Sequence, residues 1–493
     1  MNASRRGRAL LLVNALLVLA MMLGACAGSQ PVAAPQPTAA PAVDEAPTTA
    51  PEEPAPAAAT SDLDCENLSG DITVWVMEFD PHVNGWKNVA DGFMKKYPNV
   101  TVEVEPQGGQ GDMLAKYVAS LSAKSGGDIF TVPGNMVYEW SMTQQILPLT
   151  PKLWSYEDAK KALWPEYILQ SQVNNAVWAA GIPDPPGDSG LIANLDLLEE
   201  ASLEKVEKFT STEQMLEYAQ KLAQKSGDTL TRAGLSPRES NFGTYIYSYI
   251  ADQGGTFWDN DTQKFNFNTP EAKNAMQLIL DLFDKYEVDD VRLPNALDGL
   301  LQGNVAMAYM WPEFMPFATG AAPDLNMGFI MKPAYSGDNP AIFSHADTWS
   351  VVIPAYTPSP DQAYCVVDYL MSEEGQLLFL DANPGLSPLR SLVLNHEYYA
   401  TGKGAYLKPV IEAMQAGNMR YWGPWLDGST LQYDILWTTI DSMINGQLTV
   451  DDGLKKLTDD LNNQVAQSRA RVPAAPDTTV YFDKLPDELS TMK

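Results

Sequence analysis

The sequence predicts an α/β protein with at least two domains. Between residues 71 and 132, short runs of alternating apolar and polar residues are separated by two helical stretches, an order typical of parallel strands joined by helices. The chain has 493 residues, and a folded body of about 430 residues is more than one hydrophobic core usually serves. An apolar content of 45% with 10% aromatic residues excludes general disorder.

The first part of this order is expected to form one sheet. The expected elements are a strand at 72–76, a helix at 84–97, a strand at 100–104, a helix at 112–124 and a strand at 128–132. The strands show period-two apolar alternation, the second helix is amphipathic, and Pro98 stops the first helix. Parallel strands place ligands beyond their carboxyl ends, where Glu78 and Asn135 stand in this sequence.

Strands and helices continue through the rest of the chain without an internal repeat. Strands are expected at 177–183, 191–195, 305–310, 327–331 and 349–353. Helices are expected at 212–224 with Thr212 as N-cap, then at 269–286, 360–381, 408–416, 431–445 and 450–468. The helix at 269–286 carries its apolar residues on one face, which is typical of a helix packed on a core.

Charge and composition exclude several classes of function. The chain carries 32 basic and 62 acidic residues, a formal net charge of −30. Such a surface repels phosphate backbones, so we expect no nucleic-acid partner. Three Cys and three His are too few for a disulfide framework or a zinc cluster, and we expect no metal and no cofactor.

The N-terminus has the order of a bacterial lipoprotein signal. Three Arg lie within the first eight positions, and an apolar run at 9–23 follows that is too short to cross a bilayer of roughly 30 Å. The run ends in Leu-Gly-Ala-Cys at Cys26, which resembles a lipobox. We expect residues 1–25 to be removed and Cys26 to carry the lipid that anchors the exported protein to the outer face of the cytoplasmic membrane, at a cell surface or in a periplasm. The alternatives are a signal cut elsewhere and an uncleaved anchor.

A tether follows the lipidated cysteine. Residues 27–60 contain 8 Pro and 12 Ala, with no aromatic residue and no Lys or Arg, so they cannot bury enough surface to fold. Loss of the leader removes three Arg and no acid, which takes the net charge from −30 to −33. This acidic surface favours solubility outside the cell and says little about the ligand.

Several segments, in this order, resemble the extracellular solute-binding proteins of ABC importers, the family that includes maltose- and multiple-sugar-binding lipoproteins. The resemblance covers nearly all of 70–470. It lies in Gly-Asp-Ile-Phe-Thr-Val-Pro-Gly at 127–134, Asn-Phe-Asn-Thr-Pro-Glu-Ala-Lys at 266–273, Leu-Gln-Gly-Asn-Val-Ala-Met-Ala-Tyr-Met-Trp at 301–311, and the segments 358–364, 372–376 and 388–390. Family members often carry paired glycines before the strand at 350, where this chain has Ser-His-Ala-Asp-Thr-Trp at 344–349.

The resemblance implies a two-lobed periplasmic-binding-protein-like fold of type II, in which each lobe is a mostly parallel sheet flanked by helices and hinge crossings join the lobes. Residues 61–185 with 340–386 would form the first lobe, 186–339 with 387–470 the second, and 471–493 a C-terminal tail. Ligand contacts from both lobes would stabilise the closed form, the kind of hinge closure for which periplasmic binding proteins are an example.

Aromatic residues near the expected cleft are candidates for stacking on a sugar. Sugars present apolar C–H faces and rings of hydroxyl groups, so flat rings and planar polar groups suit them. Trp311 is the first candidate, with a core position as the alternative, and Trp349 and Trp422 come next. For Trp258 the better alternative is the anchor of a hairpin.

Charged and polar residues at the expected crossings are candidates for bonding a ligand. Asp188 lies just after the first crossing, Asp347 lies at the second and Arg390 lies at the third. Glu78 and Asn135 would face the same cleft. For each of these the alternative is a solvated loop residue.

Cys65 and Cys365 remain after lipidation. The resemblance puts both in the first lobe, and an oxidising compartment would let them pair, so a disulfide is a hypothesis.

A protease-like segment, Gly-Asp-Ser-Gly at 187–190, needs a His base, and only His82 precedes it without a supporting motif. The sequence therefore does not favour a protease.

The preferred function is a monomeric binding protein, without enzymatic activity, that captures a sugar or oligosaccharide and presents it to an ABC permease. A cationic or peptide-like solute is the first alternative, because the acidic charge and aromatic supply would also suit an amine. A surface glycoside hydrolase or an adhesion lipoprotein is the second.

Overall fold

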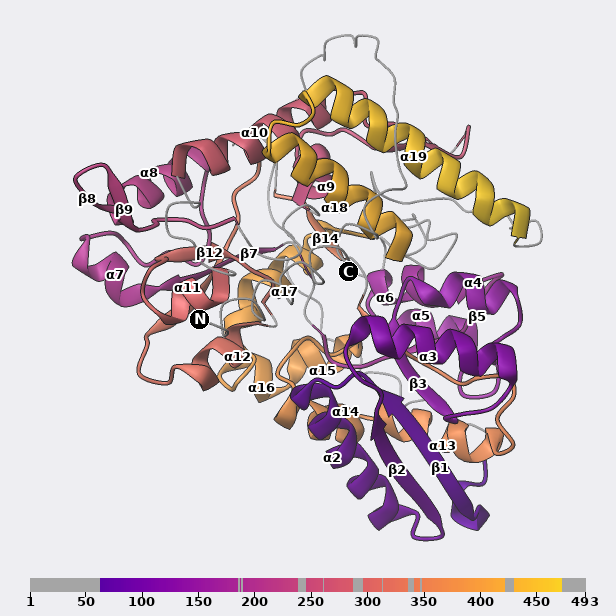
Figure 1. Cartoon of the computed structure of the whole chain (residues 1–493). Coiled ribbons are helices and arrows are strands. Elements are labelled where there is room, and N and C mark those ends of the chain that lie inside the picture. Colours follow the sequence, from indigo (N-terminus) through magenta and orange to yellow (C-terminus); the bar gives the residue numbers. More distant parts are fainter. Residues whose placement is uncertain are drawn as a thin grey trace, which may run out of the picture.

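A computed structural model gives the fold of the chain, which has two lobes built on separate sheets (Figure 1). It describes residues 63–184, 187, 189–237, 245–259, 261–286, 296–312, 314–335, 341–345, 348–421 and 430–471. The predicted two-lobed α/β class is confirmed.

The first lobe contains a five-stranded sheet in the order β2-β1-β3-β15-β6. Its strands are β1 (Gly70–Val76), β2 (Val100–Pro106), β3 (Ile129–Pro133), β6 (Ala180–Gly181) and β15 (Trp349–Val352). β1 pairs in parallel with β2 and β3, whereas β15 pairs antiparallel with β3 and β6. The sheet therefore combines the start of the chain with a strand that arrives nearly 280 residues later.

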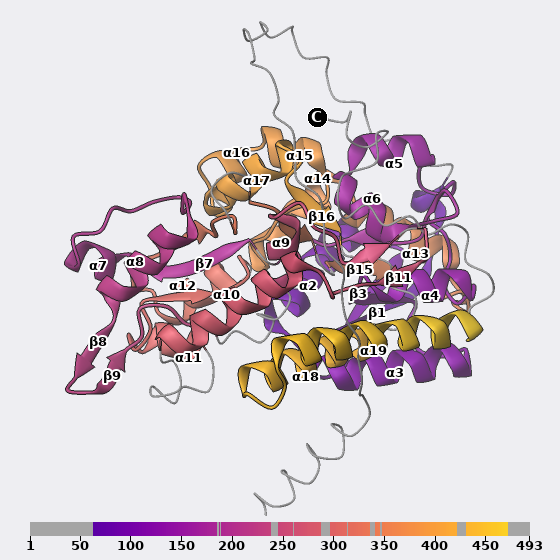
Figure 2. The ribbon, with the colours of Figure 1, turned by 90° about the horizontal axis from the view of Figure 1, so that it is seen from above.

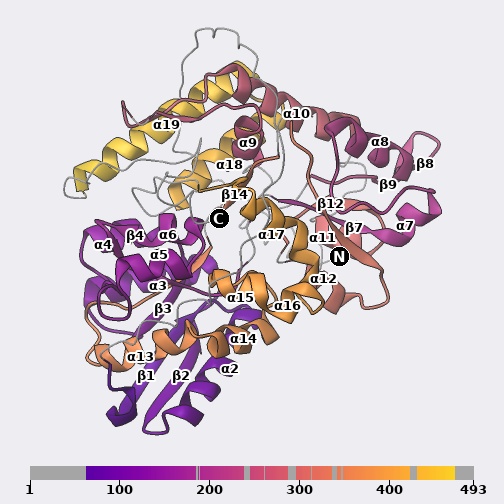
Figure 3. The same ribbon diagram turned by 180° about the vertical axis from the view of Figure 1, so that it is seen from behind.

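Helices that precede the second lobe in the sequence and helices that follow β15 cover this sheet. They are α2 (Asp80–Lys96), α3 (Gln110–Ala123), α4 (Met136–Met142), α5 (Tyr156–Ala162), α6 (Pro165–Ser171), α13 (Pro360–Leu370) and α14 (Glu373–Ala382). The orange α13 and α14 lie beside the indigo β1 and α2, and the view from behind shows the same arrangement (Figures 1 and 3). Pro at the start of α2 and α13 suits the first turn of a helix, where its missing N–H costs nothing.

The second lobe contains a three-stranded sheet in the order β12-β7-β13. Its strands are β7 (Gly190–Asn194), β12 (Met307–Tyr309) and β13 (Met327–Met331). The other helical segments are η1 (Cys65–Asn67), α7 (Leu195–Glu200), α8 (Thr212–Leu222), α9 (Tyr245–Ala251), α10 (Pro270–Tyr286), α11 (Ala296–Leu301), α12 (Phe314–Ala321), α15 (Arg390–Asn395), α16 (Glu397–Ala400), η4 (Ala405–Leu407), α17 (Lys408–Gln415), α18 (Thr430–Ile444) and α19 (Val450–Arg471). Seen from above, α18 and α19 run side by side, and both contact α10 (Figure 2).

Small two-stranded sheets complete the described part of the fold. Three are antiparallel pairs, β4 (Gln172–Val173) with β5 (Ala176–Val177), β8 (Gln224–Ser226) with β9 (Thr229–Arg232), and β10 (Trp258–Asp259) with β11 (Lys264–Phe265). The fourth pairs β14 (Phe343–His345) in parallel with β16 (Met419–Tyr421).

The strand directions in the second lobe correct the expected pairing. We expected mostly parallel sheets, but β7 is antiparallel to both β12 and β13. Single parallel bridges, such as Ser236 with Ala308, flank these pairs. The reason is the route of the chain. β7 begins where the chain enters the second lobe and runs away from the first crossing, whereas β13 runs back toward the second crossing. β15 begins where the chain re-enters the first lobe, and it is likewise antiparallel to its neighbours β3 and β6.

The cap of α8 also differs from the prediction. Ser211, not Thr212, is the N-cap, and its side-chain oxygen accepts the N–H of Gln214 at 3.2 Å. The Oγ1 of Thr212 instead donates to the carbonyl of Ala334 at 3.1 Å. Two hydroxyl residues in succession offer the same capping chemistry, and tertiary packing selects the first.

A disulfide in the first lobe and a fully buried ion pair in the second join distant parts of the chain. Cys65 in η1 and Cys365 in α13 form a disulfide with a Cα–Cα distance of 5.8 Å. In the second lobe Lys332 and Asp252 form a fully buried ion pair of 2.9 Å. The Asp252 carboxylate also accepts the N–H groups of Tyr335 and Ile342, so it fixes the chain on both sides of residues 336–340.

Candidate functional site

Within the described ranges, three chain segments link the lobes, and they meet at Asp184. The first runs from β6 to β7, the second from β13 to β15, and the third follows α14. The Asp184 side chain is 3% exposed, and its Oδ2 accepts the N–H of Trp349 at 3.1 Å. The N–H of Asp184 donates to the carbonyl of Leu386 at 3.0 Å. One residue thus bonds the first segment to the second and to the third.

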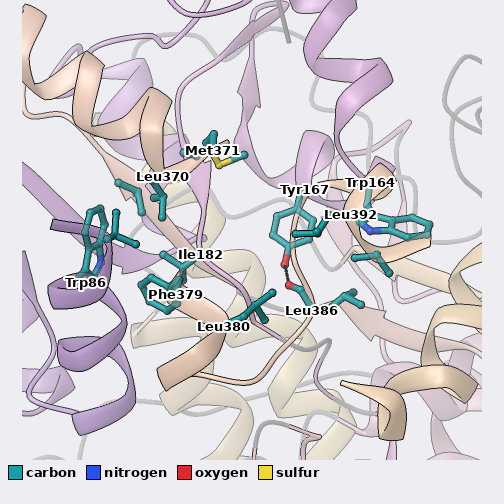
Figure 4. Close-up of a cluster of buried hydrophobic side chains, with 14 of the residues drawn as sticks. Trp86, Trp164, Tyr167, Ile182, Leu370, Met371, Phe379, Leu380, Leu386 and Leu392 are labelled. Carbon is teal, nitrogen blue, oxygen red and sulfur yellow. Dashed lines mark hydrogen bonds between the residues drawn. The ribbon is translucent and has the colours of Figure 1, made fainter. Parts of the chain in front are cut away.

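Helix α6 supports this junction from the first lobe. The Tyr167 hydroxyl lies 3.2 Å from the carbonyls of both Asp184 and Leu386, and Figure 4 shows it pointing at Leu386. Burial, followed by the charge of Asp184, raises the pKa of Tyr167 well above its ordinary value, so the hydroxyl stays protonated and donates. The side chain of Gln170 bonds Thr348 through both amide atoms, by Nε2 to the carbonyl at 2.7 Å and by Oε1 to the hydroxyl at 2.9 Å.

A row of rings extends from the second crossing along the first lobe. The half-buried Trp349 meets the ring of His82 edge to face, with centroids 5.0 Å apart and planes at 79°. His82 meets Phe79 in the same way, at 5.1 Å and 80°. Burial lowers the pKa of His82 to about 3, so its ring is neutral at physiological pH. We refer to Trp349, His82 and Phe79 as the aromatic row.

Trp311 lies on the second lobe, between β12 and α12, and is half-buried. Its indole packs against Gly187 of the first crossing, where an added Cβ would come within 3.0 Å of Cε2 and 3.1 Å of Cζ2. A larger residue at position 187 would require this ring to shift by a few tenths of an ångström. The structure therefore places Trp311 against the first crossing, and one side of its ring is occupied by the chain itself.

A cavity of about 600 Å³ lies between the two lobes. Phe79 and Pro81 line it from the start of α2, and Asp381 and Asn383 from the end of α14. The opposite wall is α12 with Met315, Pro316, Phe317, Thr319 and Gly320, together with Lys403 and Tyr406. Its walls offer apolar and aromatic faces with a few polar groups, the composition typical of small-molecule sites.

The remaining predicted residues have different positions. Glu78 is exposed at the end of β1, and Asn135 is buried at the start of α4. Arg390 is half-buried, its guanidinium donates to the carbonyl of Lys161 at 3.4 Å, and burial lowers its pKa. Asp188, Asp347 and Trp422, with Cys26, lie outside the described residues.

The structure corrects the proposal that Trp258 contacts a ligand. Its ring is buried in the core of the second lobe, where it meets Phe265 edge to face with centroids 4.9 Å apart. These residues pair across the β10–β11 hairpin, so the hairpin-anchor alternative describes Trp258. A large apolar ring next to a turn satisfies either interpretation in sequence, and burial decides between them.

The serine of the protease-like segment at 187–190 is not placed to act as a nucleophile. Ser189 is fully buried, and its hydroxyl donates to the carbonyl of Gly187 at 3.1 Å. His82 is enclosed by aromatic rings on the first lobe.

Sequence reasoning missed residues that organise the site. Asp184 stands four positions before the predicted Asp188, in Pro-Asp-Pro-Pro-Gly-Asp, and that proximity was the available signal. His82 was considered only as a base. Phe317 carried no sequence signal, because a Phe in a short apolar helix is ordinarily a core residue.

In the part of the chain that the structure describes, no helix is both long enough and apolar enough to span a membrane. Within the same ranges, no group of three or more His, Cys, Asp or Glu side chains is arranged to hold a metal ion.

Solved structures share the two-lobed fold over most of the chain. The GacH receptor of Streptomyces glaucescens, solved unliganded and with acarbose, matches with a TM-score of 0.68 and 19% identity, over 81% of this chain and 99% of that one. An ABC transporter solute-binding protein from Thermotoga lettingae, bound to α-D-tagatose, gives 0.64 and 21%, over 80% and 100%. The substrate-binding protein Lmo0181 of Listeria monocytogenes, in complex with cycloalternan, gives 0.66 and 16%, over 81% and 99%.

The family follows from a match in sequence. Residues 80–377, more than half of the chain, match the family described as bacterial extracellular solute-binding protein. This range contains His82 and Trp349 of the aromatic row, Asp184 and all of α12, so the first two crossings lie within the match. The chain belongs to the bacterial extracellular solute-binding proteins.

Proposed function

We propose that the protein captures a sugar or oligosaccharide between its lobes and delivers it to an ABC permease, without chemistry on the ligand. The observation that carries the proposal is the placement of Trp349. Its backbone N–H bonds the carboxylate of Asp184, and its ring packs against the ring of His82. The half-buried indole is therefore held at the crossing in one orientation. A fixed aromatic face suits the C–H face of a sugar ring.

The two walls of the interlobe cavity support binding by closure. Phe79 belongs to the first lobe and Phe317 to the second, so a ligand between them contacts both only when the lobes approach. The ligand stabilises the closed form by the difference in its contacts between the two states. The solved structures of similar fold with acarbose, α-D-tagatose and cycloalternan support a saccharide.

The proposal extends to the location of the protein. The lipobox-like sequence at Cys26 and the tether at 27–60 support an exported lipoprotein that reaches from the membrane to its permease. Fatty-acid labelling of growing cells tests this. Label on the wild type that is lost in Cys26→Ser is expected, and label retained in that variant would exclude Cys26 as the site.

A ligand screen on the purified protein in detergent tests the function. Maltose, mannobiose, spermidine, choline and a tripeptide are each added, and unfolding is followed by differential scanning calorimetry. A ligand at 100 times its Kd stabilises the native state by about 2.7 kcal/mol, and we expect this only with a saccharide. Trp349→Ala should remove the shift, whereas Trp178→Ala, at another half-buried Trp of the first lobe, should keep it.

Each other outcome assigns a different function. A shift with spermidine or choline alone would replace the sugar by a cationic solute. Shortened saccharides after incubation, detected by chromatography, would show a glycoside hydrolase and overturn the binding-only proposal.

A further inference from the structure

We infer that the membrane anchor joins the first lobe at the end opposite the interlobe cavity, and that the disulfide fixes this point of attachment. The inference rests on the proposed lipoprotein. It goes beyond that proposal by assigning how the body is oriented at the membrane and why the segment between Cys26 and Leu63 is long. For the cavity to meet a permease in the membrane, that segment has to span more than the length of the first lobe.

Strand β1 separates the point of attachment from the cavity. Cys65 lies five residues before Gly70, the first residue of β1. Phe79, which lines the cavity, comes three residues after Val76, the last residue of β1. A strand of seven residues is about 20 Å long from its first Cα to its last. The anchor and the cavity therefore belong to opposite ends of the same strand.

Helix α2 runs along the same lobe in the opposite direction. It starts at Asp80 beside the cavity, where Pro81 is a wall residue, and it ends at Lys96, shortly before β2. Val100 of β2 pairs with Gly70 of β1, so the end of α2 lies at the amino end of the sheet. Its 17 residues rise about 25 Å. Together, β1, β2 and α2 extend away from the second lobe (Figures 1 and 3).

The residues just before β1 are held against α13 and the core. Cys65 is bonded to Cys365, which is 1% exposed, so the covalent link reaches a buried position of a helix. The Nε2 of Gln362, also on α13, donates to the carbonyl of Ser69 at 2.9 Å. Leu68 packs on the hydrophobic core of this lobe. A pull on the lipid is therefore received by α13 and does not peel β1 from its place between β2 and β3.

The length of the preceding segment suits this arrangement. Residues 27–62 lie between the lipid and the described body, and these 36 residues reach at most about 130 Å. The permease lies in the membrane, so a delivered ligand leaves the cavity toward the membrane. The attachment end of the lobe, about 25 Å away along α2, then points outward, and the segment has to return past the whole lobe. A segment shorter than the lobe would hold the cavity away from the membrane.

Deletion of residues 30–60 tests the inference without a change to the folded body. It leaves five residues between Cys26 and Leu63, which reach at most about 18 Å, less than the length of the lobe. The matched control replaces the same 31 residues by Gly and Ser, which keeps the length and changes the composition. The melting temperatures of both variants should equal that of the wild type.

Two dye positions on α2 report the orientation of the protein on lipid vesicles. Asn84→Cys lies near the cavity and Lys95→Cys near the amino end of the sheet, and both positions are exposed. Eleven residues make close to three full turns, so the dyes share one face of α2 and differ by about 16 Å along it. Because Cys65 and Cys365 are bonded to each other and Cys26 carries the lipid, a maleimide dye reacts with the introduced cysteine.

Energy transfer from each dye to an acceptor lipid is the measurement. We expect stronger transfer from position 95 than from position 84 in the deletion variant. In the full-length protein and in the Gly-Ser control, the two positions should show nearly equal transfer. Equal transfer in the deletion variant, or stronger transfer from position 84, would overturn the inference.

Uptake of labelled maltose and mannobiose by cells measures delivery. The deletion variant should lose uptake and the Gly-Ser control should keep it, whereas calorimetric binding of the same sugars by the purified proteins should not change. Full uptake by the deletion variant would overturn the need for a long segment. A wild type that neither binds nor imports either sugar would count against the proposed function, and the vesicle measurement would still decide the point of attachment.

Discussion

The carboxylate of Asp184 and the backbone N–H of Trp349 join two different lobe crossings by a part-buried hydrogen bond of 3.1 Å. The acceptor is the side chain of a buried residue, and a carboxylate acceptor makes such a bond stronger than one between neutral groups. Trp349 is also the first residue of β15 and the start of the aromatic row. The position of the indole and the link between the first two crossings are therefore set at the same residue.

Removal of this carboxylate should destabilise the fold. Asp184→Ala leaves the N–H of Trp349 buried without its acceptor, at a cost of about 1–3 kcal/mol. Asp184→Asn keeps an acceptor and should lose less. Urea unfolding followed by circular dichroism measures both, with Asp324→Ala at an exposed position as the control. A midpoint for Asp184→Ala equal to that of the wild type would contradict the role of the junction.

His82 should make stability depend on pH. Its pKa falls from 6.5 to about 3 on folding because burial disfavours the charged ring. Below pH 6.5 the unfolded chain binds a proton that the folded chain does not, so stability falls as the pH falls from 6.5 toward 3. Between pH 7 and pH 5 this amounts to about 2 kcal/mol. Chemical unfolding at both pH values should show a smaller pH difference for His82→Phe than for the wild type, and equal differences would exclude His82 as the source.

The disulfide should be present without added oxidant and should stabilise the first lobe. Loss of a native disulfide costs about 2–5 kcal/mol, and Cys65 and Cys365 are 300 positions apart, so the bond restricts a very long loop of the unfolded chain. Cys65→Ser should lower the melting temperature, as dithiothreitol should for the wild type. Thiol counts on the denatured Cys26→Ser chain should rise from none to two on reduction. Two thiols before reduction would show that the cysteines do not pair.

The buried pair Lys332–Asp252 should behave as a unit. Either Lys332→Met or Asp252→Asn leaves one buried group without its partner and should cost about 3–5 kcal/mol. The double variant Lys332→Met/Asp252→Asn should cost less than the sum of the two single changes. Lys221→Met, in an exposed pair with Glu217, should cost below about 1 kcal/mol. Additive single losses would show that the two residues act independently.

The sequence predicts the elements that have strong local signals. β13 has the predicted bounds, 327–331, because four apolar residues and a glycine lie between turn-forming segments. β7 was also predicted, at 191–195, but its direction against β12 and β13 was not. Direction depends on which lobe the chain has just left, and that information is not local.

The residues of the candidate site also divide into those with a local sequence signal and those without one. Trp349 is a candidate from the sequence because it stands at the start of a predicted strand, and the structure places it at the second crossing. Its contact with a ligand stays a prediction. Asp184 was missed because two Asp residues in one Pro-rich turn look alike, and folding buries the first of them. Trp258 was a candidate and is buried, whereas Phe317 was not a candidate and is exposed. The size of an aromatic ring does not reveal which ring is buried and which remains exposed. The lobe boundaries stay a prediction.

The entry of β15 into the first sheet has a consequence for the order of assembly during synthesis. The chain is made from its N-terminus, so β1, β2 and β3 are complete long before residues 349–352 exist, and the edge of β3 that β15 covers waits unpaired. Cys65 waits in the same way for Cys365. The three strands of the second sheet all lie within 190–331. The lobe that begins first in the sequence is therefore the one whose sheet closes last.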